Sequence, residues 1–446
     1  MKLKIRNQKS ETRSKSATAF RRLLLSTFCL LLSAFCLAVL VAGAIQAPEE
    51  KALTPTDFPA PDFPTVANPS PGPASVSPQT PERPVPSTQP GGPGGAGSTP
   101  TGSQPISPAP EGENLAASLW INSPVLTMKQ LRGKVALIDF WEYTCINCIR
   151  TFEQNKKWYD RYHKYGFEII GVHDPEFDIA FHAANVRTAV KRFGLPYPVF
   201  VDPEFQLWQA YHNDSWPSRF LVDSKGITRF HRNGEGGDPA FEHAIQRFLL
   251  EAHPGLSFPS DYIIAPEPDA SAASCGAPTE EMYVGDWPGK GILSNREGYH
   301  DGKTVHYDLP ASINDGQAAV SGAWESDKNG MTYRGKKGGG HATPDELLMS
   351  YHARELYAVI NVSHGRPSVL YIQQDSKDLT PANKGVDVKL DAQGRSYIEV
   401  KEPRLYYLVQ NPAFGAHSVT LTPSKPGLTI NSFTFGNDCQ VDFPHL

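Results

Sequence analysis

The sequence has few cysteines and few charged residues for its length, and only one long uncharged run of apolar residues. Six cysteines in 446 residues exclude a small disulfide-rich scaffold, in which cysteine is far more frequent. Residues 1–22 contain eight basic residues and one acidic residue, whereas the remainder contains 34 basic and 46 acidic residues. A nucleic-acid-binding protein would carry its positive charge on the folded part. The composition therefore excludes that class, and also excludes multi-span membrane proteins.

The uncharged apolar run spans residues 23–45 and directly follows the basic segment, residues 1–22. A helix of this length, at about 1.5 Å per residue, can cross a hydrocarbon core about 30 Å thick. The positive-inside bias places residues 1–22 in the cytoplasm and everything after the run outside it. We therefore predict a single-pass cell-membrane protein whose C-terminal domains are exported. A signal peptide cleaved near Ala42-Gly43-Ala44 is the alternative.

Residues 46–114 are rich in Pro, Gly, Ser and Thr. Of the 40 prolines in the chain, 18 lie between Pro48 and Pro110. Such a segment buries too little apolar surface to offset its ordering entropy, so we predict a disordered, partly polyproline linker. A stalk after a membrane segment would hold a domain away from the bilayer, which favours the anchor over the cleaved signal.

Residues 115–256 follow an α/β order. The apolar runs 135–141 and 167–173 predict buried strands. The remaining pattern predicts further elements, namely helices over 149–165, 178–193 and 239–252, and strands over 197–201, 218–222 and 227–231. Alternating strands and helices, followed by a hairpin and a helix, indicate an α/β domain.

A Cys-x-x-Cys pair, Cys145 and Cys148, lies between the first of these strands and the first helix. This placement indicates thiol–disulfide chemistry. Unpaired N–H groups and the helix dipole at a helix N-terminus favour the Cys145 thiolate, and Cys148 can resolve a mixed disulfide formed on Cys145. Half of a zinc site is the alternative, but it needs two further ligands, and the other exported cysteines lie far away in sequence. We therefore expect no metal and no cofactor beyond the redox-active disulfide.

The segment from Asp139 to Cys148 resembles the active-site segment of thioredoxins. The resemblance implies a thioredoxin fold in which Asp139 is a buried acid that takes the proton of Cys148. A buried carboxyl has the raised pKa that this role requires. The resemblance also implies a substrate groove at Trp141, Trp216 and Pro217, with Pro217 in the place of the family's cis-proline. Trp216 is bulky for its position and leaves the shape of that groove open.

The same segment, together with residues 171–177 and 211–221, is similar to membrane-tethered exported thioredoxins of the TlpA and DipZ type. This resemblance implies a reductase that acts on protein disulfides in the cell envelope. DipZ-type proteins often carry a multi-span electron-transfer domain ahead of the thioredoxin domain, and this chain has a single apolar run there. We therefore expect a separate membrane electron donor of the DipZ, DsbD or CcdA kind.

Two further residues, Glu142 and His173, are candidates for tuning the thiolate. Glu142 lies three residues before Cys145, and His173 ends a predicted strand beside the active-site edge. The competing interpretation is a solvated glutamate and a histidine that only positions a loop. Both interpretations stay open from the sequence.

Residues 270–446 contain many short strand-like runs separated by turns, which predict an all-β, jelly-roll-like sandwich. Residues 431–436 resemble the closing strand of the carbohydrate-binding-like module behind DipZ-type thioredoxins, so a glycan is a candidate ligand. Four aromatic residues could stack on a sugar, although core packing is the commoner role: Trp287, Trp324, Tyr333 and Tyr371. Cys275 and Cys439 lie at the two ends of this domain, and we expect them to form a disulfide in an oxidising compartment.

These patterns favour an exported, membrane-anchored thiol–disulfide oxidoreductase. In this hypothesis Cys145 attacks, Cys148 resolves, Asp139 moves the proton and Pro217 shapes the substrate groove. A protein that binds glycan or cell wall, with an accessory redox domain, is an alternative of a different class. A thiol peroxidase is the third hypothesis, and it ranks last because peroxidatic sites do not need a Cys-x-x-Cys pair.

Overall fold

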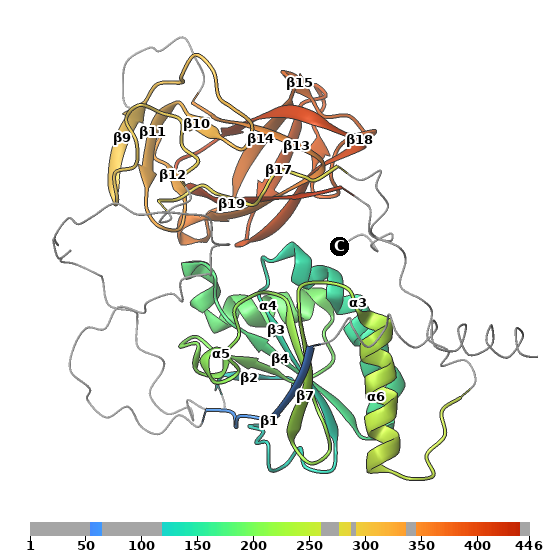
Figure 1. Ribbon diagram of the computed structural model, residues 1–446. Coiled ribbons are helices and arrows are strands. Elements are labelled where there is room, and N and C mark those ends of the chain that lie inside the picture. Colours follow the sequence, from blue (N-terminus) through green and yellow to red (C-terminus); the bar gives the residue numbers. More distant parts are fainter. Residues whose placement is uncertain (1–53, 65–117, 260–275, 287–290, 336–344, 438–446) are drawn as a thin grey trace, which may run out of the picture. The chain divides into compact units, whose positions relative to one another are not determined.

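The computed structural model describes residues 54–64, 118–259, 276–286, 291–335 and 345–437 (Figure 1). Several sequence predictions lie outside these ranges, namely the basic segment, the apolar run at 23–45, most of the linker, Trp287, Cys275 and Cys439. Within the described ranges, no helix is both long enough and apolar enough to span a membrane.

The first domain is built on a seven-stranded mixed sheet with the order β1-β7-β6-β3-β4-β5-β2. Strands β3, β4 and β5 are parallel, whereas β6 and β7 run antiparallel to their neighbours. The strands are β1 (Thr54–Pro59), β2 (Trp120–Ile121), β3 (Val135–Trp141), β4 (Phe167–His173), β5 (Val199–Val201), β6 (Ser218–Val222) and β7 (Ile227–Asn233). This arrangement confirms the predicted thioredoxin-like α/β fold.

Helices cover this sheet, and every residue of β3 and β4 is buried. A strand with both faces covered reads as a continuous apolar run, which is why these two strands were evident from the sequence. The helices are α3 (Ile146–Tyr162), α4 (Ala183–Phe193), α5 (Gln206–Ala210) and α6 (Asp238–Ala252), with 3-10 turns η2 (His163–Tyr165) and η3 (Asp178–Phe181). The single helix predicted over 178–193 is wrong in one detail: extended backbone at His182 divides it into η3 and α4.

Strand β1 corrects the prediction that residues 46–114 are wholly a disordered linker, because it is an edge strand of the first sheet beside β7. Aromatic side chains explain the difference. Phe63 is buried and packs edge-to-face on Trp120, with ring centroids 5.0 Å apart, and Phe58 packs on Tyr211 at 5.9 Å. The Asp62 carboxylate also accepts the backbone N–H of Met128 at 2.8 Å. Two phenylalanines among the prolines thus bury enough apolar surface to order residues 54–64.

The second domain is all-β, as predicted. Its strands form one antiparallel hydrogen-bonded network whose main path runs β16-β17-β14-β18-β13-β19-β12-β11-β9. The strands are β8 (Met282–Tyr283), β9 (Lys303–Tyr307), β10 (Ala318–Val320), β11 (Gly322–Ser326), β12 (Met331–Tyr333), β13 (Leu347–Val362), β14 (Ser368–Gln374), β15 (Lys377–Asp378), β16 (Lys389–Leu390), β17 (Ser396–Val400), β18 (Arg404–Pro423) and β19 (Leu428–Gly436); a 3-10 turn, η4 (Ser363–Gly365), follows β13.

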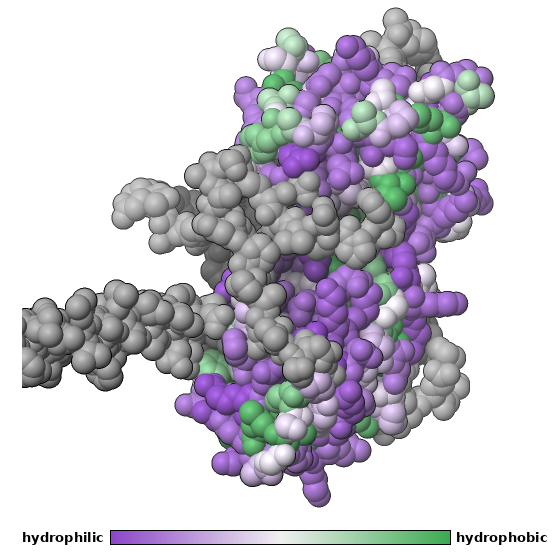
Figure 2. All heavy atoms as spheres, turned by 90° about the vertical axis from the view of Figure 1, so that its right-hand side faces the viewer, coloured by the Kyte–Doolittle hydropathy of each residue, from purple (hydrophilic) through white to green (hydrophobic). Residues whose placement is uncertain are grey.

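The core of the second domain explains its strand pattern. In β14 and β17, buried and more exposed residues alternate, as expected where one face of a sheet is covered. Trp324 and Tyr333 are buried in this core, with rings 5.3 Å apart, so neither offers a face to a sugar. The surface seen in Figure 2 is mainly hydrophilic, with apolar residues in small scattered groups.

We expect Phe63→Ala to destabilise the first domain by about 3–5 kcal/mol, the usual cost of deleting a buried phenylalanine side chain. Urea unfolding of the chain, followed by tryptophan fluorescence, measures the change. Pro59→Ala is the matched control, because Pro59 lies in the same segment and is exposed. An unchanged midpoint for Phe63→Ala would show that residues 54–64 do not contribute to this core.

Candidate active site

The two cysteines lie at the start of helix α3. Strand β3 ends at Trp141, and after a short turn Cys145 becomes the N-cap residue of α3. The Cys145 Sγ accepts the backbone N–H of Cys148 at 3.2 Å, and both thiols are free. Cys145 is partly exposed, whereas Cys148 is fully buried. Cys145 is therefore the thiol that a substrate can reach, and Cys148 lies behind it.

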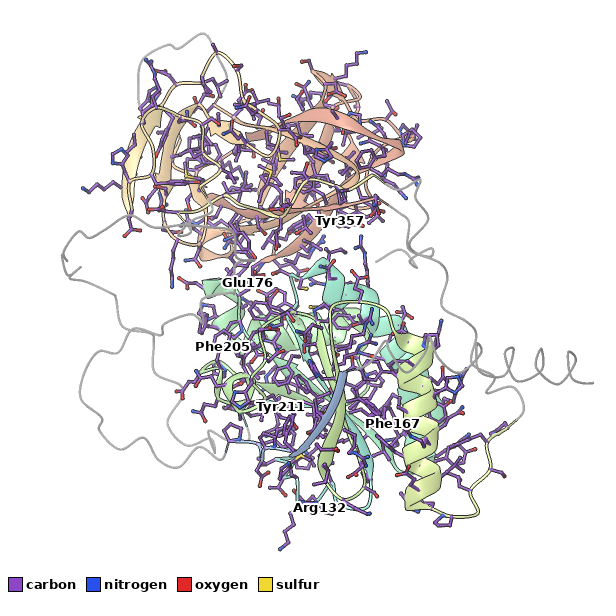
Figure 3. The ribbon with its side chains drawn as sticks, viewed as in Figure 1. Arg132, Phe167, Glu176, Phe205, Tyr211 and Tyr357 are labelled. Atoms are coloured by element: carbon purple, nitrogen blue, oxygen red, sulfur yellow. The ribbon has the colours of Figure 1, made fainter. Side chains whose placement is uncertain are left out.

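Two opposing effects act on the Cys145 thiol. Burial raises its pKa and has the largest effect, and the carboxylates of Glu176 and Glu142 raise it further. The hydrogen bonds from Cys148 lower it, as expected of the helix N-terminus. The pKa of Cys145 is raised overall. The helix N-terminus stabilises the thiolate, as the sequence predicted, but burial and the two glutamates outweigh that effect. Glu176, labelled in Figure 3, lies in the loop between β4 and η3.

Asp139 is fully buried in β3, and burial raises the pKa of its carboxyl to about 7. Two groups oppose this rise. Asn155 donates from Nδ2 to Asp139 Oδ2 at 2.8 Å, and the charge of Arg219 favours the carboxylate. The pKa of Cys148 is raised well above its ordinary value, first by burial and in part by the Asp139 charge. The Asp139 carboxyl can therefore bind and release a proton near neutral pH. The Cys148 thiol beside it stays protonated at that pH unless a base takes its proton.

Glu142 and His173 form a buried pair next to the cysteines. Both side chains are fully buried, and Glu142 Oε1 lies 3.7 Å from His173 Nε2. The other carboxylate oxygen, Oε2, accepts the backbone N–H of Thr144 at 2.5 Å. The His173 ring stacks on Tyr143 at 5.6 Å. The solvated glutamate considered in the sequence analysis is therefore wrong, because burial and the Thr144 N–H hold this carboxylate inside the active-site turn.

The residues predicted for the substrate groove divide into two groups. Trp141 is fully buried, with its ring 5.2 Å from Phe152 and 5.0 Å from His173. It supports the site from behind and does not line a surface groove, because none of its side chain is exposed. Trp216 is half-buried and precedes Pro217 through a cis peptide bond.

Two residues of the site were missed from the sequence, Asn155 and Arg219. Asn155 lies seven positions after Cys148, on the same buried face of α3. A polar residue at this helical spacing could have indicated from the sequence that it faces the site. Arg219 is fully buried and stands opposite Asp139 in the β3–β6 pairing. Asp238 pairs with Arg219 at 2.7 Å. Strand pairing places Arg219 there, and no local pattern could have found it.

Comparisons with known proteins agree with this geometry. Residues 121–231 match the AhpC/TSA family, and residues 279–436 match the thioredoxin-like C-terminal domain family. Thiol-disulfide oxidoreductase YkuV of Bacillus subtilis is 28% identical over 133 residues, which are 30% of this chain and 88% of YkuV. Thiol-disulfide oxidoreductase ResA of Geobacillus thermodenitrificans is 34% identical over 95 residues, which are 21% of this chain and 52% of ResA.

The fold, the Cys-x-x-Cys pair at the start of α3 and these matches define a thioredoxin-like protein, and the chain is similar to proteins of the DipZ type. The similarity to Protein DipZ of Mycobacterium bovis is too long to lie within one folded domain. It amounts to 30% identity over 320 residues, or 71% of this chain. The chain spans 41% of the length of DipZ.

The raised pKa of Asp139 predicts how stability depends on pH. Because the folded-state pKa lies above the ordinary value of 3.8, stability falls as the pH rises from about 4 to about 7. Asp139→Asn removes this loss, so the variant should be more stable than the wild type at pH 8 by up to roughly 4 kcal/mol. The difference should shrink toward pH 4.

Urea unfolding across this pH range measures the effect. Asp160→Asn is the control, because Asp160 is an exposed acid on α3. A wild-type stability that rises between pH 4 and pH 7 relative to Asp139→Asn would contradict the prediction.

Glu142→Gln should lower the pKa of Cys145, because it removes a negative charge that raises it. The amide oxygen can still accept the Thr144 N–H, so the turn is kept. Alkylation of Cys145 by iodoacetamide at pH 7 should become several-fold faster, since a fall of one pKa unit raises the thiolate fraction about tenfold. Glu153→Gln, further along α3, is the charge-matched control. An equal or slower rate for Glu142→Gln would contradict this account.

Proposed function

We propose that the chain is an exported, membrane-anchored thiol–disulfide oxidoreductase that reduces disulfides in proteins of the cell envelope. The observation that carries the proposal is the pairing of a partly exposed Cys145 at a helix N-terminus with a buried Cys148 beside a carboxyl whose pKa is about 7. The names of YkuV and ResA, both thiol-disulfide oxidoreductases, support the same activity.

The first step is attack by the Cys145 thiolate on one sulfur of a substrate disulfide. A mixed disulfide forms, and the other substrate sulfur leaves as a thiolate. The backbone N–H of Cys148, 3.2 Å from Cys145 Sγ, stabilises the attacking charge. Because burial raises the pKa of Cys145, most of this thiol is protonated at neutral pH. The thiolate fraction, and with it the rate of attack on the substrate disulfide, therefore increases as the pH rises.

The second step releases the reduced substrate. The Asp139 carboxylate takes the proton of Cys148, and the resulting thiolate attacks Cys145 Sγ. The Cys145–Cys148 disulfide forms, and the second substrate sulfur leaves as a thiolate, so two electrons pass to the substrate. Asn155 and Arg219 keep the carboxylate accessible at neutral pH, because both oppose the rise that burial causes.

The reaction needs a source of two electrons to regenerate the thiols. We propose a separate membrane donor of the DipZ, DsbD or CcdA kind. The eight basic residues and the uncharged run at 23–45 support a single-pass anchor that places the cysteine pair on the same side of the membrane as exported substrates. Alkaline extraction of membranes, which leaves only integral proteins behind, tests this anchor.

For the second domain we propose a jelly-roll-like sandwich closed by a Cys275–Cys439 disulfide. Its all-β order and shared core support the sandwich. Trp324 and Tyr333, two of the four candidates for sugar stacking, serve the core, so no specific observation favours glycan binding as a second function.

The proposal predicts opposite effects for the two cysteines. Cys148→Ser should trap mixed disulfides with envelope proteins, because Cys145 still attacks and nothing resolves the product. Cys145→Ser should trap none and abolish disulfide reduction. Non-reducing gels and mass spectrometry of the purified variants measure both outcomes. Trapping by neither variant, with both proteins folded, would contradict a thiol–disulfide role.

The direction of electron flow follows from the reduction potential of the pair, measured by equilibration with glutathione buffers. A value near that of thioredoxin, about −270 mV, is expected of a reductase. A value near that of DsbA, about −120 mV, would make the protein an oxidant. Faster consumption of the Cys145 thiol by peroxide than by protein disulfides would instead support a thiol peroxidase.

A further inference from the structure

The reaction described above leaves one fully buried carboxyl without a role, that of Asp174. This residue follows strand β4, and its side chain has no exposed surface. Neither carboxylate oxygen has a hydrogen-bond partner among the described residues. An ionised carboxylate buried without partners is very costly, so this carboxyl is held neutral.

A second carboxyl, that of Asp202, lies next to it. In the parallel pairing of β4 with β5, His173 stands opposite Val201, and the Asp202 N–H donates to the His173 carbonyl at 2.8 Å. Asp174 and Asp202 therefore leave the sheet side by side, and the Asp202 carboxyl is near enough to influence the ionisation of Asp174. Three backbone N–H groups at the start of α5 donate to the Asp202 carboxylate, namely those of Gln206 (2.9 Å), Leu207 (2.7 Å) and Trp208 (3.1 Å).

These contacts decide which of the two carboxyls carries the proton. Burial raises the pKa of Asp202 as well, but the three N–H groups that donate to its carboxylate oppose that rise and favour its ionised form. Burial raises the pKa of Asp174 well above its ordinary value, and the neighbouring Asp202 charge raises it further. Because ionisation of one carboxyl disfavours ionisation of the other, the proton resides on Asp174, the carboxyl that accepts none of these N–H groups.

The third member of the cluster is Trp216, the residue before Pro217. Its ring lies 4.5 Å from that of Trp208 and 6.5 Å from that of Phe205, which is labelled in Figure 3. The indole nitrogen is buried and has no hydrogen-bond partner among the described residues, and it lies near enough to the Asp174 carboxyl to influence its ionisation. A neutral carboxyl is complementary to both neighbours, since its O–H can donate to Asp202 and its C=O can accept the indole N–H.

We propose that Asp174 is a positioning residue of the substrate groove: as a neutral carboxyl it links the Asp202 carboxylate to the indole of Trp216 and so holds the segment that leads into Pro217. This inference rests on the proposed function, because the groove matters only if the cysteines react with a protein disulfide. Asp174 does not touch the reacting sulfurs, and it acts through Trp216.

Like a neutral carboxyl, an amide can donate one hydrogen bond to Asp202 and accept another from the indole N–H. An aliphatic side chain of similar size can do neither. We therefore compare Asp174→Asn with Asp174→Leu in the full chain, purified in detergent. With insulin as the protein disulfide, Asp174→Asn should keep the wild-type KM. Asp174→Leu should raise KM about tenfold, the effect of one lost buried hydrogen bond, with kcat unchanged. Hydroxyethyl disulfide, which is too small to use the groove, should react equally with all three proteins.

Trp216→Phe removes the indole N–H and keeps an aromatic ring. It should raise the KM for insulin as Asp174→Leu does, and the double variant should be no worse than either single variant, because both remove the same contact. The indole N–H resonance of Trp216 should shift in Asp174→Leu and stay in place in Asp174→Asn. These measurements separate positioning from a general loss of stability, which would affect both disulfides.

Three results would overturn the inference. Asp174→Asn behaving like Asp174→Leu would show that the ionised carboxylate is the working form. Unchanged KM in Asp174→Leu would show that the cluster does not act on the groove, and additive effects in the double variant would show that the two residues act separately. If the wild type reduces neither insulin nor hydroxyethyl disulfide, the proposed function itself fails, and this result is distinct from the other three.

Discussion

A carboxyl group buried inside the central sheet is the constraint on which the rest of the first domain depends. Asp139 needs a hydrogen bond and a nearby positive charge to be accessible as a carboxylate, and it obtains them from Asn155 on α3 and Arg219 on β6. Arg219 is itself buried, so it needs Asp238 and the faces of Trp158 and Phe241. One functional charge thus requires two helices and a neighbouring strand to be placed correctly.

The C-terminal ends of the parallel strands concentrate polar groups in an otherwise apolar interior. Strand β3 leads to Glu142, β4 ends at His173 and continues to Asp174, and β5 leads to Asp202. All four side chains are buried, at the edge of the sheet that also carries the cysteines. Parallel strands place the residues after them at one edge, so groups far apart in the sequence share one low-dielectric region and influence one another strongly.

The strands and most of the helices could be predicted because their signals are local. Buried strands such as Val135–Trp141 are continuous apolar runs, and the turn between β6 and β7 contains typical turn residues. Strand β1 could not be predicted, because the prolines around it resemble a disordered linker. Phe58 in the strand and Phe63 just after it find their partners only in the folded domain.

The sequence by itself determined that a Cys-x-x-Cys pair follows a buried strand and begins a helix, because strand, turn and helix signals all lie within a few residues of the cysteines. Only the tertiary structure decided how those groups ionise. The pKa of Asp139 depends on burial, on Asn155 sixteen residues away and on Arg219 eighty residues away. The neutral state of Asp174 depends in the same way on Asp202. Burial and charge act through space, and a pattern along the chain does not contain those distances.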